Sequence, residues 1–377
     1  MNASLDEKLQ NVQWGEYRIG DLFEKLKTNN LKMKVSDLSP KKTADFTLPV
    51  LTAGIENQGL NNYAPRDNAT ILKNVISISA NGANTGATFY QNKEFTVLQD
   101  AYAISFKGEY IPNDNQYLFL TSAITKSIYG SFAWTDKAGW EKVKKEFIQL
   151  PTKNGKIDFE FMNAYISELE EERISELSAY LTVSGLDSYE LSSEEKDALE
   201  IYNDMVFDEY KFKDIFNNIK QGRRLKKDDQ IIGNIPFVMS GRTNTGVVGY
   251  ISNPIALFSK NSITIDIFGN SFYRNYDFGA GDDTGIYWNS EVQYPKETML
   301  YFTTAMEKAL FGKYSYGKKL RSSQSFNFKM QLPTKNNEID FTYMELLISA
   351  VKKLVIKDVV LYADNKINAT KKVISKN

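Results

Sequence analysis

The chain has 377 residues, which is long enough for two domains that each bury a sizeable core. It contains no cysteine and no histidine, which excludes disulfides, thiolate or imidazole metal ligands, and serine triads with a histidine base. The formal net charge is −1, so any binding of nucleic acid must depend on local basic clusters. Because no apolar run has membrane-spanning length and the N-terminus does not resemble a signal peptide, we expect a cytoplasmic protein without membrane contact.

The first half opens on an aromatic and acidic segment that follows a polar lead-in at residues 1–13. This segment contains Trp14, Tyr17, Asp21 and Phe23. The same spacing recurs in the second half of the chain, at Phe207, Tyr210, Asp214 and Phe216. A segment that recurs in register is the signature of an internal repeat and predicts two copies of one fold.

Short strand-like runs separated by turn residues follow in both halves, at residues 46–110 and 235–290. Leu48-Pro49-Val50 with Gly54, Asn57, Gly59 and Tyr63 matches Ile235-Pro236-Phe237 with Gly241, Asn244, Gly246 and Tyr250, at one constant offset. Aromatic residues make up 13% of the chain, which favours β-rich domains. We expect a helix after each run, at residues 116–129 and 296–311.

A pentapeptide then occurs twice. Gln149–Lys153 and Gln331–Lys335 have the same sequence. Asp158 and Asp340 follow them at the same distance along the chain, and a short carboxylate at these positions predicts a helix N-cap. The first helix is predicted over residues 158–181.

Apolar residues at steps of three and four predict one apolar face on each of these helices. The first helix is acidic on its other side and the second is basic, so we predict that the two pair antiparallel. The predicted seam between them comprises Phe159, Met162, Ile166, Leu169, Phe341, Met344, Ile348 and Val351. Gly185 is predicted to end the first helix, and Ser192 with Glu195 to start a short helix in the connector.

The predicted fold is therefore α+β, with two β-rich globular domains in tandem repeat and two long helices packed as an antiparallel coiled-coil pair with a pseudo-two-fold axis. We predict the first domain at residues 1–157 and the central spacer helix with its connector at 158–205. The second domain is predicted at 206–339, and the C-terminal spacer helix with its tail at 340–377.

This doubled order resembles the specificity (S) subunits of type I restriction–modification systems and their type IIB relatives, over the whole chain. The residues that carry the resemblance are Trp14, Tyr17, Asp21 and Phe23, the turn with Ser79, Gly82 and Gly86, the pair Leu150 and Pro151, and the helix from Asp158. The second half departs from the pattern, since Phe207 replaces the tryptophan and Asp266–Gly269 replaces the first-half turn.

The resemblance implies two target-recognition domains that each read one half of a split double-stranded DNA target. It also implies that the long helices act as a spacer and as a docking surface for methyltransferase subunits, with restriction subunits as further candidate partners. Catalysis would belong to those partners. No cofactor is expected in this chain, and S-adenosylmethionine, ATP or Mg²⁺ would be bound only by the partner subunits.

Basic clusters interleaved with aromatic and amide side chains occupy matching positions in the two halves, which favours DNA contact over an ordinary solvated face. Lys137 falls opposite Lys319 and Gly139 opposite Arg321, so the two halves are expected to read different bases. The candidate DNA-binding residues are Lys27, Lys32, Lys34, Lys41, Lys42, Asn81, Asn84, Lys137, Arg223, Arg224, Lys226, Lys227, Arg242, Lys313, Tyr316, Lys318, Lys319, Arg321 and Gln324.

Two other classes of function remain open at this point. A subunit with its own methyltransferase or nuclease activity is one, although Asn253–Ala256 and Phe278–Gly281 only partly match methyltransferase motifs. A tandem binding protein for glycans or proteins, using the exposed aromatics, is the other. Binding that falls with added salt would separate DNA recognition from the latter.

Overall fold

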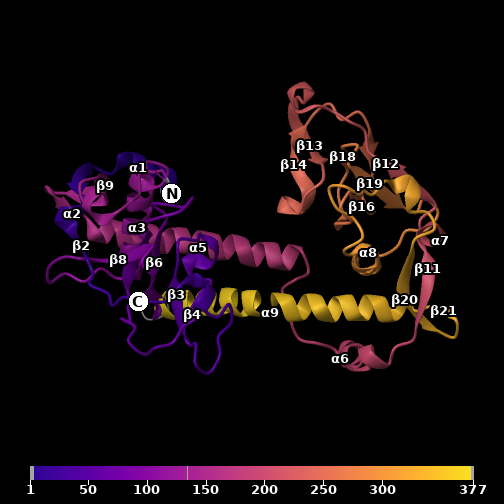
Figure 1. Cartoon of the computed structure of the whole chain (residues 1–377), viewed down its shortest axis with the longest axis horizontal. Helices are drawn as coiled ribbons and strands as arrows, with labels where there is room; N and C mark the ends of the chain where they lie inside the picture. The colour runs from indigo at the N-terminus through magenta and orange to yellow at the C-terminus, as the bar shows by residue number, and fades with distance from the viewer. Residues whose placement is uncertain (1–3, 134, 375–377) are drawn as a thin grey trace. The chain divides into compact units, whose positions relative to one another are not determined.

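The computed structural model describes residues 4–133 and 135–374 and divides the chain into two compact units, Met1–Glu176 and Leu177–Asn377. Both units are α+β, and the predicted tandem repeat of one fold is confirmed (Figure 1). In the described part of the chain, no helix combines the length and apolar character needed to cross a membrane.

The elements of the first unit follow the predicted order of short strands, a helix, a strand and a long helix. They are α1 (Leu5–Asn11), β1 (Trp14–Arg18), α2 (Ile19–Leu22), β2 (Phe23–Lys25), η1 (Val35–Asp37), β3 (Leu48–Leu51), η2 (Glu56–Gly59), β4 (Asn62–Ala64), β5 (Val75–Ser79), β6 (Thr88–Gln91), β7 (Thr96–Val97), β8 (Ala101–Phe106), α3 (Asp114–Ile128), α4 (Trp140–Val143), β9 (Phe147–Lys153), β10 (Lys156–Ile157) and α5 (Phe159–Val183), whose last residues belong to the second unit.

The second unit repeats this order with small differences. Its elements are α6 (Ser193–Glu200), η3 (Ile201–Asp204), β11 (Phe207–Lys211), α7 (Phe212–Ile215), β12 (Asn218–Gln221), η4 (Lys227–Asp229), β13 (Ile232–Val238), η5 (Thr243–Gly246), β14 (Val247–Ile251), β15 (Leu257–Phe258), β16 (Ser262–Asp266), β17 (Ser271–Arg274), β18 (Phe278–Ala280), β19 (Thr284–Trp288), α8 (Lys296–Leu310), η6 (Ser322–Gln324), β20 (Lys329–Lys335), β21 (Glu338–Ile339) and α9 (Phe341–Ile374).

The sheets of the two units have the same topology. The order β2-β8-β5-β6 in the first unit corresponds to β12-β19-β16-β17 in the second, and β4-β3-β7 corresponds to β14-β13-β18, to which β15 is added. In both units the opening strand pairs antiparallel with the strand that contains the repeated pentapeptide, with Trp14 opposite Pro151 and Phe207 opposite Pro333. The residues that repeat in the sequence therefore pair in the same register in both units.

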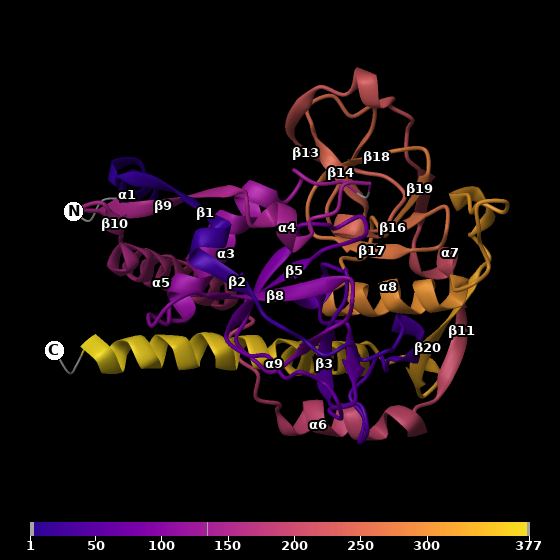
Figure 2. The ribbon, with the colours of Figure 1, turned by 60° about the vertical axis from the view of Figure 1, so that its left-hand side comes forward.

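Each core lies between a four-stranded sheet and the helix that follows it. Ile76 and Ile78 of β5 pack with Leu120 and Ile124 of α3 in the first unit. Ile263 and Ile265 of β16 pack with Phe302 and Met306 of α8 in the second. Figure 2 shows α8 running along β16 and β17.

Residues 5–11, within the polar lead-in, form the helix α1, which was not predicted from the sequence and which has no buried residue. The side chain of Ser4 accepts from the Glu7 amide and the Glu7 carboxylate accepts from the Ser4 amide, which closes a capping box. Ser192 and Glu195 form the same capping box at the start of α6, as predicted. Helices α1 and α6 are therefore equivalent elements, and the repeated unit begins earlier than the opening tryptophan.

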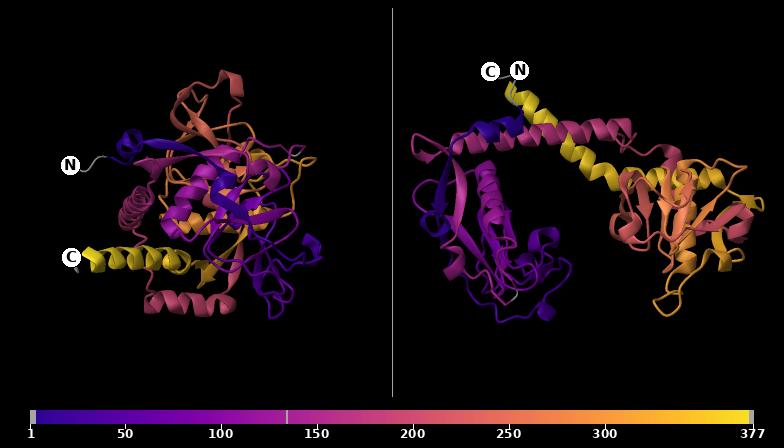
Figure 3. Two further views of the ribbon diagram at one scale, coloured as in Figure 1. Left: turned by 90° about the vertical axis from the view of Figure 1, so that its left-hand side faces the viewer. Right: turned by 90° about the horizontal axis from the view of Figure 1, so that it is seen from above.

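The long helices begin where the sequence predicts. The carboxylate of Asp158 accepts from the Phe161 amide at 2.9 Å, and that of Asp340 accepts from the Tyr343 amide at 2.9 Å. Gly185 has a φ of 62° at the end of α5, which is the conformation of a helix C-cap glycine. Helix α9 extends well beyond the sheets of the second unit (yellow in Figure 3).

The predicted helix seam needs correction, because most of its side chains attach each helix to its own domain. Met162 is fully buried in the first core, where Phe159 and Ile166 pack against it, and Leu169 lines a groove with Leu9 and Trp14. Met344 is fully buried in the second core and Phe341 stacks on Tyr294, while Ile348 is half-buried and Val351 is exposed.

Helices α5 and α9 do meet within the second unit, through other residues. Leu181 is buried with Val360 and Ala363, and Leu177 and Ile356 pack against them. The three-and-four spacing identified an apolar face correctly. The residues that cover most of that face belong to the core of the adjacent domain.

Helix α6 is fixed to α9 by a buried carboxylate. Glu195 is 5% exposed and accepts from Lys353 at 2.8 Å and from Ser349 at 2.7 Å. Burial raises the pKa of Glu195, but the hydrogen bonds from Lys353, Ser349 and the Ser192 amide outweigh it, so the pKa lies below its ordinary value. A carboxylate with a lowered pKa stabilises the fold above its unfolded pKa, and this stabilisation is lost as the pH falls through the folded pKa.

Substitution Glu195→Gln is therefore expected to lower the free energy of unfolding by about 1–3 kcal/mol at pH 7, because charge-assisted hydrogen bonds are lost. The difference from the parent chain should shrink as the pH falls below the ordinary pKa of a glutamate, about 4.3, because the stabilisation is lost towards the lowered pKa of the folded parent. Urea unfolding at pH 7 and pH 3.5 measures this, with the exposed Glu194→Gln as control. A difference that is the same at both pH values would contradict the assignment.

Candidate nucleic-acid interface

In the second unit, a buried carboxylate holds two loops together at the ends of the strands. Asp266, 4% exposed, ends β16 and accepts from the amides of Phe268 (2.8 Å), Asn270 (3.0 Å) and Gly241 (3.1 Å). It also accepts from the Asn270 side chain at 2.8 Å and from the Ser240 hydroxyl at 3.2 Å. The loops at residues 240–242 and 266–270 are thus fixed against each other before any ligand binds.

Two further loops join this edge through hydrogen bonds. The side chain of Gln221 donates to the Asp282 carbonyl at 3.0 Å and accepts from the Ser322 amide at 2.9 Å. Arg321 donates from Nη1 to the same carbonyl at 2.6 Å, and its amide donates to the Gln324 side chain at 3.2 Å. The Leu320 amide donates to the Ile267 carbonyl at 2.9 Å, which ties the loop after α8 to the Asp266 turn.

Several predicted site residues are gathered on these loops and are exposed. Arg242 donates from Nε to Asn270 at 2.7 Å, and the Arg223 amide donates to the Ala280 carbonyl at 2.8 Å. In the loop after α8, Lys318 lies 5.8 Å from the ring centre of Tyr314 and Lys319 lies 4.8 Å from that of Tyr316, which is 83% exposed. The exposed members in this region are Arg223, Arg242, Lys313, Tyr316, Lys318, Lys319, Arg321 and Gln324.

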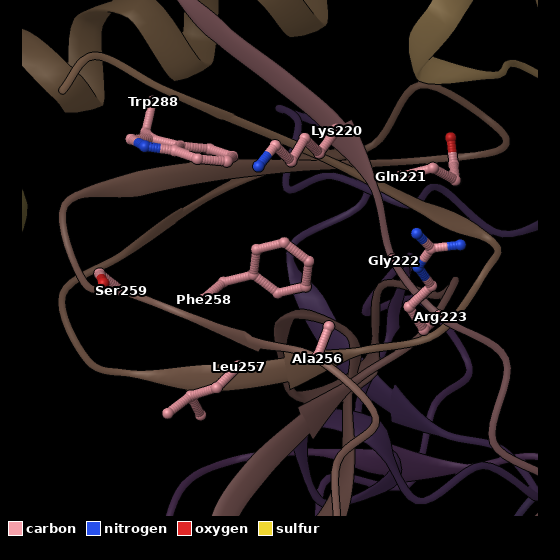
Figure 4. Close-up of a pocket in the computed structure, with 9 residues that line it drawn as sticks. All are labelled: Lys220, Gln221, Gly222, Arg223, Ala256, Leu257, Phe258, Ser259 and Trp288. Atoms are coloured by element: carbon pink, nitrogen blue, oxygen red, sulfur yellow. The ribbon is translucent and has the colours of Figure 1, made fainter.

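A hollow of about 580 Å³ adjoins this region, beside Arg223. Trp288 and Phe258 contribute its aromatic wall, with their ring centres 6.3 Å apart. Lys220 extends over the ring of Trp288 at 5.4 Å from its centre (Figure 4). Aromatic faces beside cations suit stacking and phosphate contact, although residues 220, 258 and 288 were not among the predicted site residues.

Other predicted residues lie elsewhere. Arg224, Lys226 and Lys227 are exposed on the segment that enters η4, next to two aspartates, and this segment is tied to Asn253, whose side chain donates to the Asp229 carbonyl. In the first unit, Lys27, Lys32, Lys34, Lys41 and Lys42 are exposed along one long loop between β2 and β3.

The first-unit turn that corresponds to Asp266–Gly269 is held by different polar groups. Thr85 accepts from the Ala138 amide at 2.9 Å, and Asn81 donates to Asp100 at 2.9 Å while its buried Oδ1 has no partner among the described residues. Gly86 has a φ of 87°, and a Cβ there would lie 2.8 Å from the Ile128 carbonyl oxygen, so glycine is required. Asn84 is half-buried in the same turn, and Lys137 is exposed at a hollow that it shares with Lys25.

Sequence reasoning missed two buried polar residues behind these loops. Gln91 at the end of β6 is 4% exposed, and Arg274 at the end of β17 is 1% exposed. They occupy equivalent positions, since β6 and β17 are the corresponding edge strands of the two four-stranded sheets. A polar residue at the last position of equivalent strands in both halves was the signal that could have identified them.

Two copies of one α+β fold, each presenting exposed cations and amides on loops at its strand ends, define a tandem protein for nucleic-acid recognition. Comparison with known proteins agrees with this class. Type I restriction modification DNA specificity domains match the chain twice, at residues 11–179 and 206–361. The chain belongs to this family.

Two similar proteins can be compared with the chain in more detail. The type II restriction enzyme specificity subunit S.BcgI of Heyndrickxia coagulans is 25% identical over 248 residues, which cover 65% of this chain and 69% of that protein. The crystal structure of the type I restriction-modification system S subunit from M. genitalium matches with a TM-score of 0.56 at 15% identity, covering 97% of this chain and 95% of the other. The second similarity shows that the fold is shared.

Proposed function

We propose that the chain is the DNA-recognition subunit of a restriction–modification complex and reads a bipartite, asymmetric double-stranded target, one half-site with each unit. The observation that supports this most directly is the repeated fold with different side chains on equivalent loops. Arg321 in the second unit stands opposite Gly139 in the first when the two copies of the pentapeptide are aligned. Arginine reads guanine in the major groove, whereas glycine offers no side chain for base contact.

We further propose that methylation and cleavage belong to partner subunits, with methyltransferase subunits docked on this chain and restriction subunits as further partners. S-adenosylmethionine, ATP and Mg²⁺ would then be bound by those partners. A titration of the isolated chain with S-adenosylmethionine tests this division of labour. Binding to the isolated chain would favour the alternative of an enzyme subunit.

Substitution Arg321→Ala is expected to relax the second half-site by about 1–3 kcal/mol per lost base contact and to leave the first half-site unchanged. Affinity of the parent chain should fall steeply with added salt, because phosphate contacts release counterions. Binding to labelled duplexes at several salt concentrations measures both effects. Lys329→Ala is the control, since Lys329 pairs with Glu209 at 2.6 Å. Equal loss at both half-sites in the Arg321 variant would contradict the assignment.

The long helices are proposed to set the gap between the half-sites. One heptad inserted after Glu171 in α5 and one after Lys353 in α9 lengthens each helix by about 10 Å, which is about three base pairs of duplex. We expect the gap to lengthen by this amount while both half-site sequences stay the same. Sequencing of the methylated sites in cells that carry the variant measures the gap, and an unchanged gap would refute the spacer role.

A further inference from the structure

One pair of loops has a backbone conformation that is unusual for its residues and is repeated in both units. In η2, Asn57 and Gln58 have φ values of 47° and 56°, and in η5 Asn244 and Thr245 have φ values of 47° and 52°. Left-handed conformation is costly for residues other than glycine, and a β-branched threonine there is a genuine outlier. Keeping two such residues in succession, twice, requires surrounding structure that enforces them.

That structure is a buried polar side chain behind each loop. Gln91 donates from Nε2 to the Gln58 carbonyl at 3.1 Å and to the Ser77 hydroxyl at 3.1 Å. Arg274 donates from Nη2 to the Thr245 carbonyl at 2.5 Å and from Nε to the Thr264 hydroxyl at 2.9 Å. The same carbonyl is held in both units, although the residue that holds it has changed from an amide to a guanidinium.

Arg274 has a further contact and an unusual charge environment. Its Nη1 donates to the Thr245 hydroxyl at 3.1 Å and to the Tyr276 hydroxyl at 3.0 Å. In the described part of the chain no carboxylate pairs with Arg274, and burial lowers its pKa. A buried cation with neutral partners costs free energy that an apolar residue would not. Its presence here therefore points to a requirement on the loop that it holds.

The loop closes on a glycine in both units for steric reasons. A Cβ at Gly59 would lie 2.4 Å from Leu51 Cδ1, and one at Gly246 would lie 2.7 Å from the Met239 carbonyl oxygen. The residues before the glycine are exposed at the tip. In the second unit this tip directly follows Arg242 and the Ser240–Gly241 segment that Asp266 holds, so it belongs to the same edge as the candidate interface.

The two loops share their frame and differ in their tip residues. Asn57 and Asn244 are the same and serve the frame, since each side-chain amide donates to a carbonyl three residues ahead. Gln58 and Thr245 differ at equivalent positions. Side chains such as these distinguish base edges in the major groove, glutamine by pairing with adenine and threonine by contact with the thymine methyl group. The Thr245 hydroxyl already accepts from Arg274, so its methyl group is the part that remains for a base.

We propose that these two loops, residues 56–59 and 243–246, are specificity-determining DNA contacts, one for each half-site, and that Gln91 and Arg274 are positioning residues that hold them from behind. The proposal rests on the proposed function of the chain as a DNA reader. Beyond that function, it identifies the residues that set base preference and the buried residues that hold those loops in place.

The test exchanges the tip residues between the units. Thr245→Gln and Gln58→Thr are made separately in the full chain with its methyltransferase subunit, and each complex selects from a pool of random DNA duplexes. We expect Thr245→Gln to change base preference about tenfold at one position of the second half-site only, and Gln58→Thr to do so in the first only. Unchanged enrichment in both variants would overturn the proposal. If the parent complex enriches no bipartite sequence, the proposed function itself fails.

The positioning role is tested with Arg274→Met and Arg274→Gln. Methionine removes every donor to the Thr245 carbonyl, so the second half-site should lose about tenfold in preference while the first half-site and the salt dependence stay the same. Glutamine, the residue of the first unit, can restore one donor and should recover most of the preference. A merely structural role predicts instead that both variants lose affinity for all duplexes in proportion to their loss of stability, and that result would overturn this part.

Discussion

Substitution Phe302→Ala is expected to lower the free energy of unfolding of the second unit by about 3–5 kcal/mol, the range for a large aromatic removed from a close-packed core. Phe302 has no exposed surface and contacts three aromatic rings edge-on. Its ring centre lies 5.6 Å from that of Phe216, 5.2 Å from Tyr294 and 6.4 Å from Phe341. It thereby joins α8 to the start of α9.

Urea unfolding followed by circular dichroism measures this change, and two further variants calibrate it. Phe302→Leu introduces the residue that the first unit has at the equivalent position, Leu120, and should cost about 1–2 kcal/mol. Phe311→Ala removes a ring that is 79% exposed and should change stability by less than about 0.5 kcal/mol. Similar losses in Phe302→Ala and Phe311→Ala would show that this core does not hold the unit together.

Substitution Asp266→Ala is expected to remove sequence preference at the second half-site and to lower the free energy of unfolding by about 2–4 kcal/mol. The carboxylate accepts five hydrogen bonds, three of them from backbone amides that would be left without an acceptor. Each buried donor without a partner costs about 1–3 kcal/mol, partly offset where water can enter. The loops at 240–242 and 266–270 would then no longer be fixed in position against each other.

Selection from random duplexes and urea unfolding measure the two effects. Asp277→Ala is the matched control, because Asp277 is exposed and accepts from a single backbone amide, that of Lys260. We expect this control to keep the preference of the parent chain at both half-sites. Retention of the second half-site preference in Asp266→Ala would contradict the view that this carboxylate organises the interface.

The repeat could be predicted because identical residues recur at constant spacing in the two halves. The pentapeptide at 149–153 recurs unchanged at 331–335, and the strand pairing has the same register in both units. The N-caps Asp158 and Asp340 were identified for a similar reason, since a helix start depends on local sequence. Helix α1 was missed because its only shared signal with α6 is the capping box, and so short a helix holds too little of a periodic pattern.

Two features could not be predicted, because both depend on tertiary packing. One is which surface each long helix packs against, and the other is the position of Gln91 and Arg274 behind their loops. An apolar face at Phe159 and Met162 does not say whether a helix or a sheet covers it. Arg274 is a cation by sequence and would ordinarily be placed at the surface. Only the fold shows that it lies behind a loop much earlier in the chain, at Thr245. For the exposed cations, the sequence was enough to identify the residues as candidates for DNA contact. The structure was needed to see which of their loops lie next to one another.

The repeated pentapeptide also bears on how such a chain can change over generations. In both copies it lies in the strand that pairs with the opening strand of its unit, and a two-residue strand and then a long helix follow it. A genetic crossover between two related genes within this short stretch would keep the strand pairing and join one domain to another chain's helix. The buried Met162 has Met344 as its counterpart in the other copy, so the helix residue that enters each core is of the same type. New combinations of half-sites could therefore arise by recombination in a single step.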